Sequence, residues 1–211
     1  MSNTTNQQHW DRVYGTRSED QLTWFQDRPD LSLRLIAKHA PKGAVVDVGG
    51  GASRLVDALI AQGRPVSVVD LSLAALALSK TRLGDLAAKV DWQVADITTW
   101  QPAHRYDLWH DRAVFHFLTE DPARAAYVRT LLTALKPGGV AIIASFALDG
   151  PERCSNLPVQ RYSPETLAIE LSLHAPGQFH LIDSSHQTHT TPSGGQQNFQ
   201  VSVFRRTPES L

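Results

Sequence analysis

The sequence has very little cysteine and no marked excess of charge of either sign. Cys154 is the only cysteine among the 211 residues, so no disulfide can form within the chain and nothing requires an oxidising compartment. The 20 Lys and Arg residues nearly balance the 21 Asp and Glu residues, for a formal net charge of −1. Because proteins that bind nucleic acid over a large surface usually have a strongly basic face, we expect no nucleic-acid partner.

Long apolar runs are also missing. No apolar stretch reaches the length of about 20 residues that a membrane-spanning helix needs, and the polar segment 1–8 lacks the apolar core of a signal peptide. We therefore expect a cytoplasmic protein with no membrane partner. Hydrophobic residues still make up 42% of the chain, which is enough to build the core of a single domain over 1–211.

Strand and helix patterns alternate along the first two-thirds of the chain, as in the helix expected at 29–39. The expected parallel strands cover 44–48, 65–69, 90–95, 106–109 and 140–146. Two later strands, 179–182 and 199–204, have no helix between them and should pair antiparallel. The pattern predicts an α/β fold, with a doubly wound, mostly parallel seven-stranded sheet, helices on both faces and an antiparallel C-terminal hairpin.

The first 26 residues do not resemble core elements. Residues 1–8 should form a loose tail. Residues 9–26 mix aromatic and charged side chains, which suits a lid that lies on the domain. The Rossmann-like core would then span 27–206.

A glycine cluster directly follows the first strand and predicts a ligand site. Residues 45–51 are Val-Val-Asp-Val-Gly-Gly-Gly, and a helical pattern comes next. Glycine allows a tight turn and close approach of a ligand to the main chain, and the helix offers free N–H groups to that ligand. Because doubly wound sheets bind ligands at the carboxyl ends of their strands, other side chains near such ends are candidates as well. These candidates are Asp47, Gly49, Gly51, Asp70, Asp96, His110 and Asp111.

Acidic residues near these strand ends favour an adenosyl ligand with an ammonium group over a dinucleotide. Asp70 lies about twenty residues after the glycine loop, where a carboxylate can accept hydrogen bonds from both ribose hydroxyls; alternatively, it caps the helix that begins near Ser72. A dinucleotide fingerprint needs a third glycine where this chain has Arg54. Asp47 would face phosphates unfavourably but suits an ammonium group. These features favour S-adenosylmethionine.

The sequence resembles the class I, seven-strand S-adenosylmethionine-dependent methyltransferases. Four motifs carry the resemblance in the family's order: Val-Val-Asp-Val-Gly-Gly-Gly (45–51), Val-Ser-Val-Val-Asp (66–70), Val-Ala-Asp-Ile (94–97) and Leu-Lys-Pro-Gly-Gly (135–139). The resemblance implies S-adenosylmethionine as cofactor and S-adenosylhomocysteine as product. It also implies a set of cofactor-binding residues. The set comprises Asp47, Gly49, Gly50 and Gly51 at the methionine part, Asp70 and Leu71 at the ribose, Asp96 and Ile97 at the adenine, and His110 in the pocket wall.

The N-terminal half is most similar to small bacterial members and to certain protein lysine methyltransferases. The similarity lies in Trp10-Asp11-x-x-Tyr14, Leu22-Thr23-Trp24-Phe25 and Asp111-Arg112-Ala113. His116 stands where those lysine enzymes usually carry an acidic residue, which argues against a cationic lysine as acceptor. Trp24 could cover the cofactor with its ring facing the sulfonium, or simply pack on the sheet edge.

The reaction would be an in-line displacement at the sulfonium methyl, with His110, Asp111 and His116 as catalytic candidates. Either histidine could take a proton near neutral pH, and Asp111 could orient a histidine or bind an acceptor amine. Alternatively, His110 lines the cofactor pocket and His116 is a structural residue. In the late hairpin, His189 and Gln197 are weaker acceptor-binding candidates. No acid or cysteine completes a metal site there, so we expect no metal.

The acceptor is the least defined part of the prediction. The lid segments at 9–26 and 147–162 are short, and a small pocket closed by loops fits a small molecule. A protein lysine side chain is the main alternative. A nicotinamide-dependent oxidoreductase and a non-catalytic cofactor-binding protein are less favoured, and the oligomeric state is not predicted.

Overall fold

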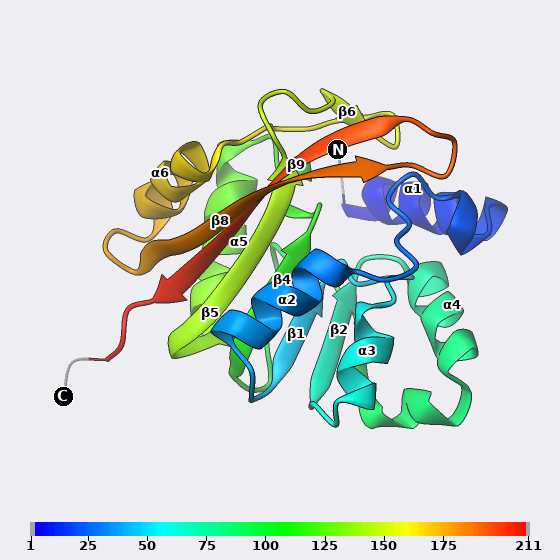
Figure 1. Cartoon of the computed structure of the whole chain (residues 1–211), viewed down its shortest axis with the longest axis horizontal. Coiled ribbons are helices and arrows are strands. Elements are labelled where there is room, and N and C mark those ends of the chain that lie inside the picture. Colours follow the sequence, from blue (N-terminus) through cyan, green and yellow to red (C-terminus); the bar gives the residue numbers. More distant parts are fainter. Residues whose placement is uncertain (1–2, 210–211) are drawn as a thin grey trace.

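A seven-stranded sheet organises the chain in a computed structural model that describes residues 3–209 (Figure 1). The strand order is β3-β2-β1-β4-β5-β9-β8, and all pairs are parallel up to β5. The strands are β1 (Val45–Val48), β2 (Val66–Asp70), β3 (Val90–Val94), β4 (Tyr106–Arg112), β5 (Leu135–Phe146), β8 (Phe179–Thr190) and β9 (Gln196–Arg206). Strand β9 pairs antiparallel with both β5 and β8. The doubly wound sheet and the antiparallel C-terminal hairpin predicted from the sequence are confirmed.

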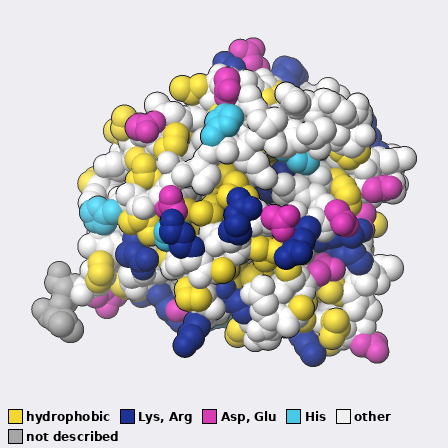
Figure 2. Space-filling view, in the orientation of Figure 1, with side chains coloured by type: hydrophobic (Ala, Val, Ile, Leu, Met, Phe, Trp, Pro, Cys, Tyr) yellow, Lys and Arg dark blue, Asp and Glu magenta, His cyan; other side chains and the backbone are white. Residues whose placement is uncertain are grey.

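Helices cover both faces of the sheet. They are α1 (Asn3–Thr16), α2 (Asp30–His39), α3 (Leu55–Ala61), α4 (Leu73–Leu83), α5 (Asp121–Ala134) and α6 (Pro164–His174). Leu35 of α2 and Leu59 of α3 belong to the core on one face, and Leu131 of α5 and Leu171 of α6 belong to the core on the other. Every residue of β1 is buried, as expected for a central strand covered on both sides. The outer surface over α2 and α3 carries interspersed basic and acidic side chains (Figure 2).

The N-terminus differs from the sequence prediction. Residues 3–16 form helix α1, where a loose tail was expected up to residue 8; residues 1 and 2 lie outside the described range. Trp10 and Tyr14 pack with Ala75 of α4, and the Asp11 carboxylate accepts hydrogen bonds from Ser72 Oγ at 2.6 Å and Ala74 N at 3.3 Å. The aromatic and charged residues that suggested a lid therefore fix this helix against α4.

The C-terminal hairpin is longer than predicted because its outer strand is largely polar. Strands β8 and β9 span 12 and 11 residues and meet at the predicted turn around Thr191–Gly195. Much of β8 is exposed or half-buried, so its sequence shows little apolar pattern. Within residues 3–209, none of the helices has both the length and the apolar composition to cross a lipid bilayer.

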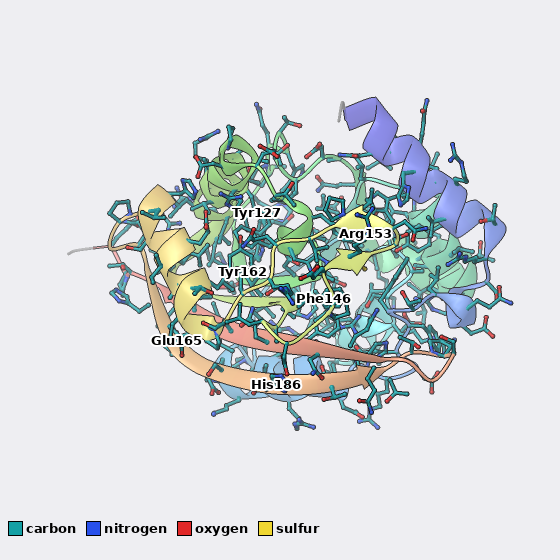
Figure 3. All side chains as sticks on the ribbon, turned by 90° about the horizontal axis from the view of Figure 1, so that it is seen from above. Tyr127, Phe146, Arg153, Tyr162, Glu165 and His186 are labelled. Atoms are coloured by element: carbon teal, nitrogen blue, oxygen red, sulfur yellow. The ribbon has the colours of Figure 1, made fainter. Side chains whose placement is uncertain are left out.

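Three structures gather at the carboxyl ends of the parallel strands (Figure 1). They are α1, the tip of the β8–β9 hairpin, and a small hairpin of β6 (Arg153–Cys154) and β7 (Leu157–Pro158) in the segment after β5. Figure 3 looks onto this end, with the β6–β7 hairpin, marked by Arg153, between α1 and the β8–β9 strands. This is the end of the sheet at which a doubly wound fold binds its ligand.

Candidate active site

A cavity of about 330 Å³ lies at the carboxyl ends of the parallel strands. Its walls come from the ends of β1, β2 and β4, the loop after β3, helix α1, the β6–β7 hairpin and β9. Of the predicted cofactor residues, the following line it: Trp24, Gly49, Asp70, Leu71, Asp96 and Ile97. The volume falls in the range of small-molecule sites in proteins.

The glycine loop after β1 leaves room for two carboxylates. Gly49 has φ of 63°, and a Cβ added there would come within 2.0 Å of Val114 Cγ2. A Cβ on Gly50 would come within 2.6 Å of Asp47 Oδ2, and one on Gly51 within 2.8 Å of Asp70 Oδ2. Gly50 and Gly51 do not line the cavity, but the lack of a side chain at each leaves the space that Asp47 and Asp70 occupy.

Asp47 is buried, and only one of its two carboxylate oxygens has a hydrogen-bond partner among the described residues. Its Oδ1 lies 2.7 Å from His110 Nδ1, whereas its Oδ2 is buried without a hydrogen-bond partner among the described residues. A buried carboxylate oxygen without a donor is costly. An ammonium group at the glycine loop would compensate this charge, directly or through water, so Asp47 fits the methionine amino group of the expected cofactor.

Asp70 sits on the cavity wall and is not the cap of helix α4. Ser72 caps that helix, because its Oγ accepts a hydrogen bond from Ala75 N at 3.1 Å. Asp70 Oδ1 accepts from Ser72 N at 2.8 Å. Burial raises the pKa of Asp70 to about 7, and the hydrogen bond from Ser72 opposes this rise. The carboxylate can therefore accept hydrogen bonds from ribose hydroxyls, which would stabilise its ionised form.

Asp96 and Ile97 extend the same wall beyond β3. Asp96 Oδ1 accepts hydrogen bonds from Thr98 N at 2.8 Å and Thr98 Oγ1 at 2.6 Å, which fixes the carboxylate at the cavity. Because β3 is the neighbour of β2 in the sheet, Asp96 lies one strand beyond Asp70. This order suits an adenosine whose ribose lies over β2 and whose base lies over β3.

The three catalytic candidates do not line this cavity. His110 is 3% exposed, with Nδ1 paired to Asp47 and Nε2 placed 2.9 Å from Ser32 Oγ, and it borders a separate cavity of about 40 Å³. Asp111 is fully buried and accepts hydrogen bonds from Val114 N, Phe115 N and the Tyr127 hydroxyl. From these hydrogen bonds we infer that His110 holds Asp47 in place. Asp111 holds the turn after β4.

His116 is also fully buried, within the wall behind the cavity. Its Nδ1 accepts a hydrogen bond from Phe146 N at 3.3 Å, and its Nε2 has no partner among the described residues. Burial, with a further contribution from the nearby Arg112 charge, lowers the pKa of His116 to about 3. A histidine with so low a pKa is a weak proton acceptor, and His116 does not line the cavity. Its position therefore favours the structural alternative over the role of a base.

Arg112 is a site residue that the sequence reasoning did not single out. It lies two residues after His110 on β4 and lines both cavities. Its Nη1 donates to the Trp24 carbonyl at 2.9 Å, and its Cζ lies 5.0 Å from the centre of the Phe199 ring. Its Nη2 is buried without a partner among the described residues. The alternation of side chains along β4 places Arg112 on the face of His110, and that spacing was the available signal.

Aromatic residues cover the cavity. The Trp24 ring lies edge-on to Trp10 at 5.8 Å and to Tyr14 at 5.9 Å, and all three line the wall. The covering segment is also held by His189, whose Nε2 donates to the Thr23 carbonyl at 2.8 Å. The prediction that Trp24 covers the site thus agrees with its position, although α1 supplies much of the cover.

A group of ionisable side chains on α5 and α6 lies away from this cavity. Asp121, Glu170 and His174 place one ligand atom each within 4.8 Å of one another. Arg124 occupies the group, since its Nε lies 2.6 Å from Glu170 Oε1 and its Nη2 3.5 Å from Asp121 Oδ1. We interpret it as an ion-pair network that joins the two helices.

Known proteins with a similar sequence or fold are methyltransferases. Residues 45–139 match the methyltransferase domain family. Over 131 residues the chain is 30% identical to trans-aconitate 2-methyltransferase from Azoarcus sp. (strain BH72), covering 61% of this chain and 50% of that protein. The chain spans about half the length of the curated relatives it matches.

Solved structures support the same fold over nearly the whole chain. A protein studied for the conversion of a disulfide bond into a thioacetal group during echinomycin biosynthesis aligns with a TM-score of 0.77 at 23% identity, over 97% of this chain and 94% of that one. N-methyltransferase NodS from Bradyrhizobium japonicum WM9, in complex with S-adenosyl-L-homocysteine, aligns with a TM-score of 0.71 at 16% identity, over 99% and 100%. Residues 45–139 therefore match a methyltransferase domain, and the chain has the fold that these solved structures share, with residues of the motifs at 45–51, 66–70 and 94–97 on the wall of one cavity.

Proposed function

We propose that this protein transfers a methyl group from S-adenosylmethionine to a small-molecule acceptor. The observation that carries the proposal is a single cavity with two chemically different ends. Asp70 and Asp96 line the end over β2 and β3, and Arg112, Gln197 and Phe199 line the end over β4 and β9. The first end suits an adenosine, and the second leaves space for an acceptor next to the glycine loop.

The residues of the chain hold and shield the reactants. When bound, S-adenosylmethionine supplies an electrophilic methyl group whose bond to sulfur breaks as the acceptor atom donates its electron pair, leaving S-adenosylhomocysteine. Asp47, Asp70 and Asp96 would hold the amino, ribose and adenine groups. Trp10, Tyr14 and Trp24 would exclude water and present aromatic ring faces to the sulfonium charge. Alignment of this kind can contribute roughly 7–11 kcal/mol to catalysis.

General base catalysis has little support in this site. His110 and His116 are buried outside the cavity wall, and His189 is buried against the Thr23 carbonyl with a pKa lowered by burial. Burial raises the pKa of Cys154 to about 12, so this thiol is protonated at neutral pH. We therefore infer that the acceptor atom already carries a free electron pair at neutral pH.

A small acceptor is favoured over a protein side chain. The cavity is covered by α1, Trp24 and the β6–β7 hairpin, which suits a molecule that the site can enclose. One relative is named for trans-aconitate, a small molecule. A lysine side chain is disfavoured because Arg112 at the acceptor end would repel an ammonium group.

The test is mass spectrometry of the small molecules and proteins of a cell extract incubated with the purified protein and methyl-labelled S-adenosylmethionine. We expect label in a small molecule. Label only in protein would contradict the small-acceptor proposal, and tight cofactor binding without any labelled product would indicate a non-catalytic binding protein. Omission of the protein, and its Asp70→Ala variant, serve as controls.

A further inference from the structure

The acceptor end of the cavity carries a cationic group whose hydrogen bonds are not all used. Among the described residues that line the cavity, Arg112 is the only basic one. One of its terminal nitrogens donates to the Trp24 carbonyl, and the other, Nη2, is buried without a partner among residues 3–209. A buried guanidinium nitrogen without an acceptor is costly, so a ligand that supplies an acceptor there gains binding energy.

Among the described residues, Arg112 forms no ion pair with a carboxylate. The nearby carboxylate of Asp47 is paired with His110 at 2.7 Å, and Glu120 lines the cavity only at its exposed rim. The pKa of Arg112 is lowered by burial to about 10, so the guanidinium remains charged at neutral pH. Burial keeps the surrounding His116 and Cys154 neutral there, with pKa values of about 3 and about 12.

The direction of the side chain favours the acceptor over the cofactor as the bound partner. In the sheet, β4 lies between β1 and β5, and β9 lies beyond β5. Arg112 extends from β4 toward β9, where its Cζ stacks at 5.0 Å over Phe199. The glycine loop and Asp47 belong to β1, on the other side of β4.

The other walls of this end define the rest of the ligand. Phe199, Phe117 and Trp10 give it large apolar surfaces. Gln197 Oε1 is buried without a partner among the described residues and offers a hydrogen-bond acceptor. A planar guanidinium beside apolar walls matches a carboxylate on a largely apolar molecule.

We propose that the acceptor is a small, largely apolar molecule carrying a carboxylate, which the guanidinium of Arg112 binds. The inference rests on the proposed function because it names the substrate class of the same site. It also agrees with the lining of the cavity, which includes no histidine among the described residues, since an anionic oxygen needs no proton removed before it binds or reacts.

The test compares 4-fluorobenzoate with its neutral analogue 4-fluorobenzamide, titrated into the complex of the protein with S-adenosylhomocysteine and followed by fluorine NMR. We expect the carboxylate to bind at least about tenfold more tightly, as a charge-assisted pair predicts. Equal affinities, or no binding of 4-fluorobenzoate at about 50 mM, would overturn the proposal. This readout needs no turnover, so it is separate from the methyl-transfer experiment that tests the proposed function.

Variants of Arg112 test whether this residue causes the preference for the carboxylate. Arg112→Met should remove the preference for the carboxylate, whereas Arg112→Lys should keep part of the preference. Arg129→Met, at an exposed arginine of α5, is the matched control and should leave both affinities unchanged. If Arg112→Met weakens S-adenosylhomocysteine binding tenfold or more and the preference persists, the guanidinium holds the cofactor carboxylate and the proposal is wrong.

A second variant guards against loss of structure in Arg112→Met. Gln197→Glu adds a negative charge to the same end without changing the hydrogen bond from Arg112 to Trp24. It should weaken binding of 4-fluorobenzoate and leave that of 4-fluorobenzamide nearly unchanged. Equal effects on the two compounds would contradict a carboxylate site at this position.

Discussion

The two ends of the cavity are built in different ways. The adenosyl end uses residues that directly follow parallel strands, such as Asp70 after β2 and Asp96 after β3. The acceptor end combines Arg112 of β4 with Cys154 of β6 and Gln197 of β9, which are far apart in sequence. The residues of the adenosyl end therefore belong to short local motifs. The residues of the acceptor end come together only when the C-terminal hairpin pairs with β5.

The largest expected effect is at the adenosyl end. Asp70→Ala would remove the two proposed hydrogen bonds to the ribose and should weaken S-adenosylhomocysteine binding by on the order of a hundredfold while the fold is retained. Calorimetry measures the affinity, and far-ultraviolet circular dichroism checks the fold. Asp85→Ala, at an exposed carboxylate after α4, is the control and should bind normally. An unchanged affinity in Asp70→Ala would remove this residue from the site.

A second prediction tests the glycine loop by stability. Gly49→Ala should destabilise the protein by about 3 kcal/mol or more, because positive φ and a clash with Val114 act together. Gly63→Ala is the matched control: it has φ of 70° but open space around the added Cβ, so it should cost only about 1 kcal/mol. Denaturant unfolding measures both. Equal losses would show that Val114 yields to the added methyl group.

A third prediction separates the two ends by pH. The pKa of Asp70 is raised to about 7 in the free protein. Hydrogen bonds from ligand hydroxyls would stabilise the ionised carboxylate, so the ligand should bind this form more tightly. S-adenosylhomocysteine affinity should therefore be full above pH 7 and fall as the pH drops through 7, by up to roughly tenfold per unit. Calorimetry between pH 8 and pH 6 provides the measurement, and Asp70→Asn should flatten the profile. A fall that persists in Asp70→Asn would assign the titration to another group.

The smallest expected effect on catalysis concerns His116. His116→Leu leaves Phe146 N without its acceptor and should lower the free energy of unfolding by about 1–3 kcal/mol. The pH profile of methyl transfer should keep its shape, because this histidine is buried and neutral across the working range. Denaturant unfolding and rates at several pH values check the two statements. A shifted profile would restore His116 as a base.

The sequence predicted the mostly parallel sheet, the helices on both of its faces and the residues of the adenosyl end because each depends on short patterns. Asp47, Asp70 and Asp96 all follow from strand ends with a glycine turn or an acidic residue at the expected place. Helix α1 was missed because its aromatic residues face α4 and its Asp11 bonds to Ser72, contacts that span about sixty residues of chain and leave no local signature.

The catalytic residues were less predictable because strand position does not say which face a side chain takes. His110, Asp111 and Arg112 are consecutive at the end of β4, and alternation sends Asp111 toward Tyr127 and the α5 side of the sheet. Only the pairing of β5 with β9 shows that Arg112 reaches Phe199. His116 looked available in sequence and is enclosed by Phe117 and Phe146 in the structure.

The hydrogen bond from Arg112 Nη1 to the Trp24 carbonyl has a consequence for the order of events at the site. The same guanidinium fastens the aromatic cover and faces the space where an acceptor would lie. Arg112 would therefore both contact the entering acceptor and hold the cover over S-adenosylmethionine. His189 on β8 holds the same covering segment through its hydrogen bond to the Thr23 carbonyl. If Arg112 binds the acceptor as proposed, the residue that selects the molecule to be methylated also holds the segment that excludes water.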